Sequence, residues 1–178
     1  MKFTETPLKG LWIVEPVPVR DERGAFMRIF CINEFGERGL ETRFVQHSHS
    51  LNLKKHTLRG LHFQNAPHSE VKLVSCIRGS IWDVAIDIRP GSPTRNHWFA
   101  VELTAENQRQ LYIPKGFAHG FQTLEDDTLV SYLISEFHAP DAASGMRYDE
   151  PAIGIEWPAQ PSVISDRDLK WGYLAAFS

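Results

Sequence analysis

Signals for disulfides and for membrane insertion are nearly absent from this chain of 178 residues. It has only two cysteines, Cys31 and Cys76, which form no C-x-x-C motif. This argues against a disulfide framework or a zinc ribbon, and we expect two free thiols in a reducing cytosol. No apolar run approaches the roughly 18 residues that a helix needs to cross a bilayer. The N-terminus carries Lys2, Glu5 and Lys9 in place of a signal-peptide core, so we expect a cytoplasmic protein without a membrane partner.

A strong excess of either charge is missing as well. The net charge is -3, with 23% charged and 42% hydrophobic residues, which is the composition of an ordinary globular protein. This argues against nucleic acid as a partner, because such proteins present a broad basic surface. It leaves room for a local cationic pocket that binds a phosphorylated small molecule. The length fits one domain, and we expect it to span residues 1–178.

Helical periodicity is scarce, and the chain has no internal repeat and no Gly/Ser linker. One short helix is expected over residues 32–38, ending at Gly39. A second is expected over residues 166–171, after a possible N-cap at Ser165. Neither segment is long enough to organise a helical fold.

Most of the remaining segments have the pattern of β-strands. The clearest candidates are residues 71–77, 81–88, 98–103, 111–113 and 128–135. In residues 81–88 polar and apolar positions alternate, which predicts one buried face and an opposite face that carries carboxylates. Many short strands separated by turn signals predict an all-β, cupin-type jelly-roll barrel with short flanking helices. Because such a barrel is either filled or holds one ligand, inward-facing polar side chains are the candidates for chemistry.

Eight histidines raise the question of a metal site. Segments 59–64 and 114–120 have the outline of the two cupin motifs, in which an H-x-H pair, a carboxylate and a final histidine bind a metal. Here Gln64 takes the second position of the pair, and Lys72 falls where the carboxylate would lie. An ammonium group is not a metal ligand, and the two remaining histidines are fewer than the three ligands of a catalytic zinc. We therefore expect no metal and no cofactor, with a metal-dependent cupin dioxygenase or isomerase as an alternative.

The residues at these positions suit acid–base chemistry next to a ketone. His62 can act as a general base near neutral pH. Lys72 is a positive charge that can stabilise a developing oxyanion. If the carbon is to be inverted, a second group must return a proton from the other face, and Tyr132 lies mid-strand where it can do so.

An ordered set of short motifs resembles one known family. The motifs lie at residues 21–24, 44–46, 58–64, 72–74, 83–89, 91–94 and 113–121. Together they resemble the dTDP-4-dehydrorhamnose 3,5-epimerases of deoxysugar biosynthesis, which are cupin-fold homodimers. The similarity spans about residues 21–168, most of the chain.

The resemblance implies catalytic roles. His62 matches the general base, Asp168 its carboxylate partner, Lys72 the enolate-stabilising lysine and Tyr132 the acid. A carboxylate on one ring nitrogen fixes the tautomer of a histidine and favours the imidazolium that forms. Asp166 lies close to Asp168 in the sequence and stays an alternative partner for His62.

The resemblance also implies a substrate-binding set, in which several positions depart from the family pattern. The set is Arg23, Phe26, Arg28, Gln46, His47, Arg59, His119 and His138. Arg28 stands where the family usually has glutamate, and His47 begins His-Ser-His where Asp-Asn-His is common. His138 falls where an aromatic side chain stacks on thymine, and Ala143 falls where a glutamate binds substrate. Because these departures concentrate around the nucleoside, we hypothesise that the base or the sugar differs from that of dTDP-4-keto-6-deoxyglucose.

The expected function is epimerisation at C3, C5 or both in a nucleotide-linked 4-keto-6-deoxy sugar, for deoxysugar and surface polysaccharide biosynthesis. The resemblance favours dTDP-4-dehydro-6-deoxyglucose as substrate and a homodimer as the assembly. One alternative is a 3,4-ketoisomerase, which also needs a base next to a ketone. Another is a non-catalytic, sugar-binding cupin.

Overall fold

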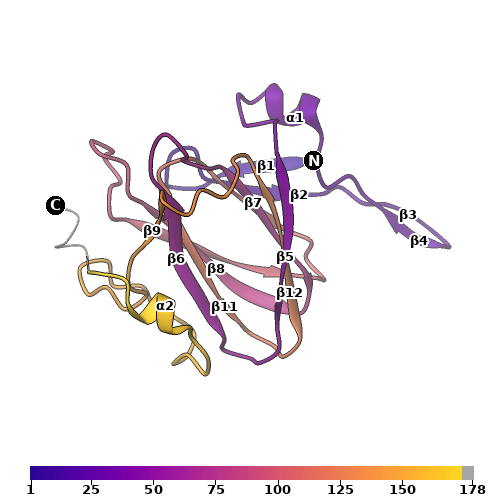
Figure 1. Cartoon of the computed structure of the whole chain (residues 1–178). Coiled ribbons are helices and arrows are strands. Elements are labelled where there is room, and N and C mark those ends of the chain that lie inside the picture. The colour runs from indigo at the N-terminus through magenta and orange to yellow at the C-terminus, as the bar shows by residue number, and fades with distance from the viewer. Residues whose placement is uncertain (174–178) are drawn as a thin grey trace.

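Antiparallel strands build almost the whole molecule, whose computed structural model describes residues 1–173 (Figure 1). A six-stranded sheet has the order β1 (Lys2–Glu5), β2 (Trp12–Glu15), β10 (Gln110–Ile113), β7 (Lys72–Arg78), β12 (Thr128–Ile134), β5 (Gln46–Asn52). A five-stranded sheet has the order β13 (Ala143–Gly145), β6 (Leu58–Gln64), β11 (Phe117–Thr123), β8 (Ser80–Asp87), β9 (Trp98–Thr104). The two sheets face each other across a shared core, and this confirms the expected cupin-type jelly roll.

Two short helices flank the barrel. α1 (Ile32–Gly36) is shorter than expected, and the chain leaves it through Gly39, whose φ of +67° suits a glycine. α2 (Asp166–Leu169) begins where the sequence predicts, because the Ser165 hydroxyl accepts a hydrogen bond from the Asp168 backbone N–H. Among the described residues, no helix is long enough and apolar enough to cross a membrane.

Strand β8 differs from expectation on its polar face. The outer residues Val84 and Ile86 pack against residues 146–157, as an ordinary buried face does. The opposite face faces the barrel interior, and Asp83 and Asp87 on it are fully buried. A buried carboxylate needs a partner, and Asp83 pairs with His119 while Asp87 pairs with Arg89. The alternation is as predicted, but both faces of the strand are covered.

The apolar core between the sheets stops at a cavity. Val74, Leu111 and Val130 of the six-stranded sheet pack against residues of the other sheet, such as Leu103. Phe121 contacts this cluster and also lines the cavity. The barrel is therefore filled on one side of Phe121 and hollow on the other.

A β-bulge in β6 decides which of its side chains enter the cavity. Opposite β11, His62 pairs with His119 and Arg59 pairs with Phe121, so β6 holds one extra residue. Gly60 occupies the bulge with a φ of +127°, and a Cβ there would lie 2.5 Å from the Cα of Gly120. Because of the extra residue, Arg59 and His62 reach the same cavity although they are three positions apart.

A two-stranded arm projects from the barrel. Strands β3 (Val19–Asp21) and β4 (Gly24–Phe26) pair only with each other and extend away from both sheets (Figure 1). Phe26 is 76% exposed and Val19 is 69% exposed. Large apolar side chains that are exposed together often mark a surface that packs against another one. An isolated two-stranded hairpin is also only marginally stable in water.

Candidate active site

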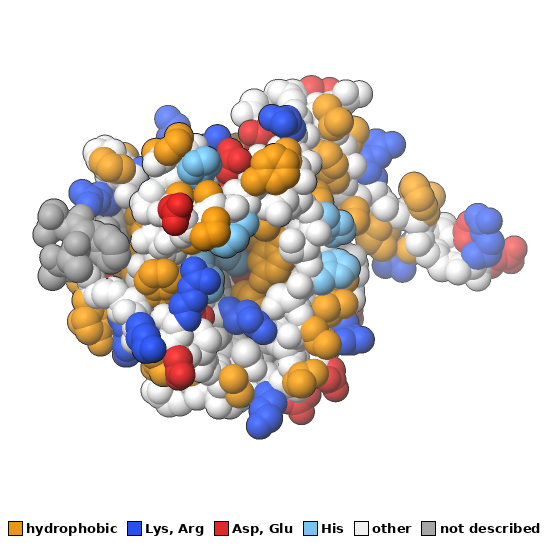
Figure 2. Space-filling model, in the orientation of Figure 1, with side chains coloured by type: hydrophobic (Ala, Val, Ile, Leu, Met, Phe, Trp, Pro, Cys, Tyr) orange, Lys and Arg blue, Asp and Glu red, His pale blue; other side chains and the backbone are white. Residues whose placement is uncertain are grey.

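A cavity of about 270 Å³ opens between the two sheets. Its lining residues are Ser48, Arg59, His62, Lys72, His119, Phe121, Tyr132 and Ile134. Figure 2 shows histidine side chains at the centre of this face, with lysine or arginine side chains beside them. A larger groove of about 670 Å³, formed by residues within 148–161, has no histidine, lysine or arginine in its lining. The chemistry predicted from the sequence therefore gathers in the smaller cavity.

His62 forms a hydrogen-bonded pair with Asp168. The Nε2 atom of His62 lies 2.7 Å from Oδ1 of Asp168, and the other carboxylate oxygen accepts the backbone N–H of Gly60 at 3.2 Å. The structure therefore decides between the two candidate carboxylates, because Asp168 is buried against His62 while Asp166 is exposed. With Nε2 engaged, Nδ1 is the ring nitrogen left to exchange a proton with a bound molecule.

The surroundings of Asp168 keep its carboxyl ionised. Burial acts to raise the pKa of Asp168, but the hydrogen bond and charge of His62, together with the Gly60 N–H, outweigh burial and lower it. An ionised carboxylate on one ring nitrogen stabilises the imidazolium that forms when the histidine accepts a proton. The pair is thus arranged as a general base with its orienting group.

His119 and Asp83 form a second, more deeply buried pair. Nε2 of His119 lies 2.7 Å from Oδ1 of Asp83, while Oδ2 of Asp83 is buried and has no hydrogen-bond partner among residues 1–173. Burial raises the pKa of Asp83, and His119 and Lys72 act in the opposite direction. The ring centroids of His119 and Tyr132 are 6.2 Å apart. His119 is therefore held firmly in the wall of the cavity.

Lys72 pairs with a residue that the sequence analysis did not single out. Its ammonium lies 2.5 Å from the carboxylate of Glu70, and the two side chains are 12% and 13% exposed. Residues two positions apart lie on the same face of an extended chain. The spacing of Glu70 and Lys72 was therefore the sequence signal that could have revealed this pair. Of the four basic side chains that line the cavity, His62, Lys72 and His119 thus each have a carboxylate partner.

Tyr132 reaches the cavity from the six-stranded sheet, whereas His62 reaches it from the five-stranded sheet. It lies in β12, in register with Ser48 of β5 and Val74 of β7. Burial raises the pKa of Tyr132, and the charge of Asp83 raises it further. The phenol therefore stays protonated across the physiological range and is suited to donate a proton.

Arg59 lines the cavity, and Gln46 begins β5 two positions before the lining residue Ser48. Nε of Arg59 donates to Oδ1 of the buried Asn52 at 2.7 Å, which holds the guanidinium at the cavity wall. Oε1 of Gln46 accepts the backbone N–H of His138 at 3.0 Å and so contacts the loop that carries this histidine. The side chain of His138 itself is exposed.

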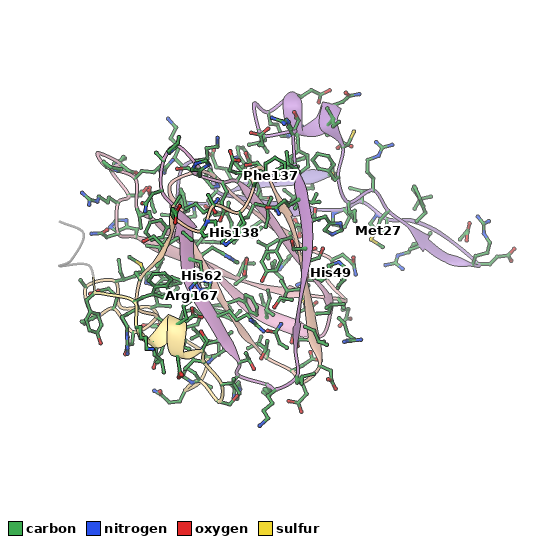
Figure 3. The ribbon with its side chains drawn as sticks, viewed as in Figure 1. Met27, His49, His62, Phe137, His138 and Arg167 are labelled. Carbon is green, nitrogen blue, oxygen red and sulfur yellow. The ribbon has the colours of Figure 1, made fainter. Side chains whose placement is uncertain are left out.

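Six of the predicted substrate-binding residues do not line the cavity of the described residues 1–173. Two of them are Gln46 and His138, and the other four are Arg23, Phe26, Arg28 and His47. The side chain of His47 lies on the outer face of β5, where Nε2 is 2.8 Å from Oγ of Ser131, and Ser48 takes the inward position instead. The other three belong to the arm or follow it, and Figure 3 shows Met27 well separated from His62. Arg28 pairs with Glu34 at 3.3 Å.

The donor groups of the cavity do not fit a metal ion. Both histidines engage Nε2 with a carboxylate, and the amide of Gln64 is occupied by hydrogen bonds to loop backbone. Among the described residues no three histidine, cysteine or acidic side chains cluster as metal ligands would.

Comparisons with known proteins point to one family. The family model described as dTDP-4-dehydrorhamnose 3,5-epimerase matches residues 5–176. The dTDP-4-dehydrorhamnose 3,5-epimerase of Methanothermobacter thermautotrophicus is 45% identical over 173 residues, which cover 96% of this chain and 92% of that protein.

Solved structures agree. The crystal structure of the enzyme of that name from Elizabethkingia anophelis superposes with a TM-score of 0.95 at 36% identity, covering 99% of this chain and 97% of that one. The dTDP-6-deoxy-D-glucose-3,5-epimerase of Legionella pneumophila, solved in complex with dTDP-4-keto-L-rhamnose, has a TM-score of 0.93 at 37% identity, covering 99% and 94%.

Proposed function

The chain belongs to the dTDP-4-dehydrorhamnose 3,5-epimerase family, and from this we propose that it inverts C3, C5 or both in a nucleotide-linked 4-keto-6-deoxy sugar. It is a carbohydrate epimerase, an isomerase of deoxysugar biosynthesis. Its favoured substrate is dTDP-4-dehydro-6-deoxyglucose, and its product serves surface polysaccharides. The observation that carries the proposal is the convergence of a paired histidine, a lysine and a protonated tyrosine on one cavity.

Epimerisation begins with removal of a proton next to the ketone. Nδ1 of His62 takes the proton from the carbon, and the electron pair of the C–H bond forms the enolate, with its charge on the C4 oxygen. Asp168 orients the ring and stabilises the imidazolium. The ammonium of Lys72 lies in the same cavity and stabilises the oxyanion, because a charge of opposite sign is most effective where water is excluded.

Inversion requires that the new proton arrive from the other side. His62 comes from β6 in the five-stranded sheet and Tyr132 from β12 in the six-stranded sheet, so the two side chains face each other across the cavity. Tyr132 donates its proton to the carbon, the carbonyl re-forms, and solvent exchange returns both groups to their starting states. The cycle is redox-neutral and draws on no cofactor.

The nucleotide part of the substrate lies toward the cavity edge. Arg59 binds the diphosphate, for which a planar guanidinium is well suited. His119 contacts the sugar, and Gln46 and His138 lie on the nucleoside side. These assignments rest on matching positions of the family and, for Arg59 and His119, on their place in the cavity lining.

A homodimer completes this site in our proposal. Arg23 and Phe26 match substrate-binding positions, yet they lie on the arm that extends away from the cavity (Figures 1 and 3). The exposed apolar side chains of the arm need a surface to pack on. A second copy of the chain supplies that surface, and each arm then brings Arg23 and Phe26 to the cavity of the partner copy.

The test is proton NMR of the purified chain in deuterated water with dTDP-, GDP- and CDP-linked 4-keto-6-deoxy sugars. We expect deuterium at C3, at C5 or at both, with inversion, and the highest kcat/KM with the dTDP sugar. Loss of the C3 proton with formation of a 3-keto sugar would identify a ketoisomerase instead. Binding without exchange in any of the three sugars would identify a sugar-binding cupin. A clear preference for the dTDP sugar would contradict the hypothesis that the substrate differs. A clear preference for the GDP or CDP sugar would support that hypothesis and indicate that the departures around His138 change the recognised base.

A further inference from the structure

Gln64 stands at the position where a cupin would place its second metal-binding histidine, and its side chain serves another purpose. It is 6% exposed and follows His62 by two residues in β6. Its Oε1 accepts the backbone N–H of Ala139 at 2.7 Å, and its Nε2 donates to the backbone carbonyls of His68 at 2.9 Å and Phe137 at 3.2 Å. Three of the four hydrogen bonds available to an amide are therefore made to loop backbone.

The loop held in this way connects β12 to β13 and is defined here as residues 135–142, the His138 loop. Phe137 is 60% exposed and His138 is exposed, so apolar burial contributes little to holding this part of the chain. Gln46 of the six-stranded sheet binds the N–H of His138, while Gln64 of the five-stranded sheet binds the residues on either side. Two glutamines from opposite sheets thus fix three successive residues of the loop.

We propose that Gln64 is a positioning residue that holds the His138 loop in the conformation that binds the nucleoside. The inference rests on the proposed function, because it takes His138 as part of the nucleoside site. Gln64 acts on nucleotide affinity through the loop and leaves the chemical step to His62, Lys72 and Tyr132.

The chemistry of an amide explains why glutamine suits this position. The loop presents the N–H of Ala139 and the carbonyl of Phe137 to the side chain, and the carbonyl of His68 comes from the segment between β6 and β7. A single group must both donate and accept to satisfy all three. A carboxylate at this position would accept from Ala139 but would face two carbonyl oxygens without a proton to donate. A methionine of similar length would leave all three backbone groups without their partner.

The experiment compares the variants Gln64→Met and Gln64→Glu with wild type, using dTDP and inorganic pyrophosphate as calorimetric probes. We expect Kd for dTDP to rise about tenfold, since buried backbone groups lose their partners and the loop loses its conformation. Kd for pyrophosphate is expected to stay within about twofold, because it lacks the nucleoside. KM for the sugar nucleotide is expected to rise with dTDP affinity while kcat stays nearly constant.

The chain offers a matched control in Gln122. This glutamine is fully buried in the adjacent strand β11, and its amide likewise binds loop backbone, at the N–H and the carbonyl of Ala159. Gln122→Met should destabilise the fold to a similar degree without changing dTDP affinity. If both Gln64 variants fail to fold, Gln64→Asn keeps the amide but shortens the side chain by one methylene, and it is expected to give the same split between dTDP and pyrophosphate.

A second comparison separates action through the loop from a general loss of structure. In a His138→Ala background, Gln64→Met is expected to add less than about a twofold further loss of dTDP affinity, because coupled residues are not additive. The proposal is overturned by full additivity in that background, by equal weakening of dTDP and pyrophosphate, or by a fall of kcat at constant KM. Binding of both probes is measured without turnover, so failure of the wild type to epimerise would contradict the proposed function and leave this test intact.

Discussion

The ammonium of Lys72, which lines the cavity, lies 2.5 Å from the carboxylate of Glu70, and both side chains are nearly buried. A second acceptor is close by, because Asp83 is near enough for its charge to interact with Lys72 and carries an oxygen without a hydrogen bond. Glu70 therefore holds Lys72 against the attraction of a more deeply buried carboxylate, at the place where an enolate oxygen is expected.

Removing the charge of Glu70 should reduce kcat. We expect Glu70→Gln to lower kcat about tenfold with little change in KM, because Lys72 turns toward Asp83 and leaves the oxyanion. Exchange of the substrate proton in deuterated water should fall by the same factor as inversion. In a Lys72→Ala background Glu70→Gln should have no further effect, and Glu102→Gln, an exposed strand glutamate, is the control. An equal effect in both backgrounds would contradict this role.

Variants of His62 and Tyr132 should distinguish the removal of the substrate proton from its return to the carbon. His62→Ala is expected to abolish exchange and inversion together, because no base remains on that side of the cavity. Tyr132→Phe is expected to leave exchange at the abstracted carbon faster than net inversion. Proton NMR in deuterated water measures both rates in one experiment. Equal losses in the Tyr132 variant would argue against its role as the acid.

Asp87 should make the fold sensitive to acid. Burial acts to raise the pKa of Asp87, but hydrogen bonds from Arg89, Ser92 and Thr94 outweigh burial and hold the pKa far below its ordinary value. A lowered folded-state pKa means that the unfolded chain binds the proton first as pH falls. The stabilisation is therefore present above about pH 4, the unfolded pKa, and is lost as pH falls below it.

Urea unfolding at pH 7 and pH 3 checks this sign. Asp87→Asn is expected to lower the free energy of unfolding at pH 7 by about 2 kcal/mol, because charged hydrogen bonds are lost. The difference between variant and wild type should shrink at pH 3. Asp141→Asn, at an exposed position, is the control and should change neither value. A difference that grows at pH 3 would contradict the argument.

Gly60 should tolerate no side chain. A Cβ there would lie 2.5 Å from Cα of Gly120 and 2.9 Å from the carbonyl oxygen of His119, so the bulge that aims His62 would have to open. We expect Gly60→Ala to destabilise the fold by more than about 3 kcal/mol and to abolish activity. Gly91→Ala is the control, with a φ of +74° and nothing within 4 Å of its Cβ. Its cost should be only about 1 kcal/mol, from the backbone conformation, by urea unfolding.

A mixture of Arg23→Ala and His62→Ala chains should regain activity if the arm of each chain completes the cavity of its partner copy. Arg23→Ala weakens the arm contribution and His62→Ala removes the base, so each homodimer is impaired. After mixing and subunit exchange, a heterodimer has one cavity with an intact His62 and an intact Arg23 from the other chain. We expect activity to reappear, up to about a quarter of wild type for random pairing of the two chains. Activity that stays at the level of the separate variants, in a mixture shown to exchange, would place Arg23 in its own cavity or outside the site.

Pattern in the sequence was sufficient to predict the fold class, and together with the family resemblance it supplied the candidate site residues. Period-two alternation in residues 81–88 predicted β8, and Ser165 predicted the start of α2, because strand faces and helix caps depend on near neighbours. His62, Lys72 and Tyr132 were identified from the residue types that acid–base chemistry needs and from motif order. The strand and helix-start predictions each rest on a short stretch of chain, whereas the candidate site residues rest on the order of motifs along most of it.

The tertiary structure alone decided what depends on distant contacts. It paired Asp168 and not Asp166 with His62, across 106 positions of sequence. It turned the carboxylates of β8 inward by covering the outer face, and it brought Glu70 against Lys72. It also placed Ser48 where His47 was expected and carried Arg23 and Phe26 away on the arm. These outcomes follow from register, from one extra residue at Gly60 and from sheet packing, and local sequence periodicity encodes none of the three.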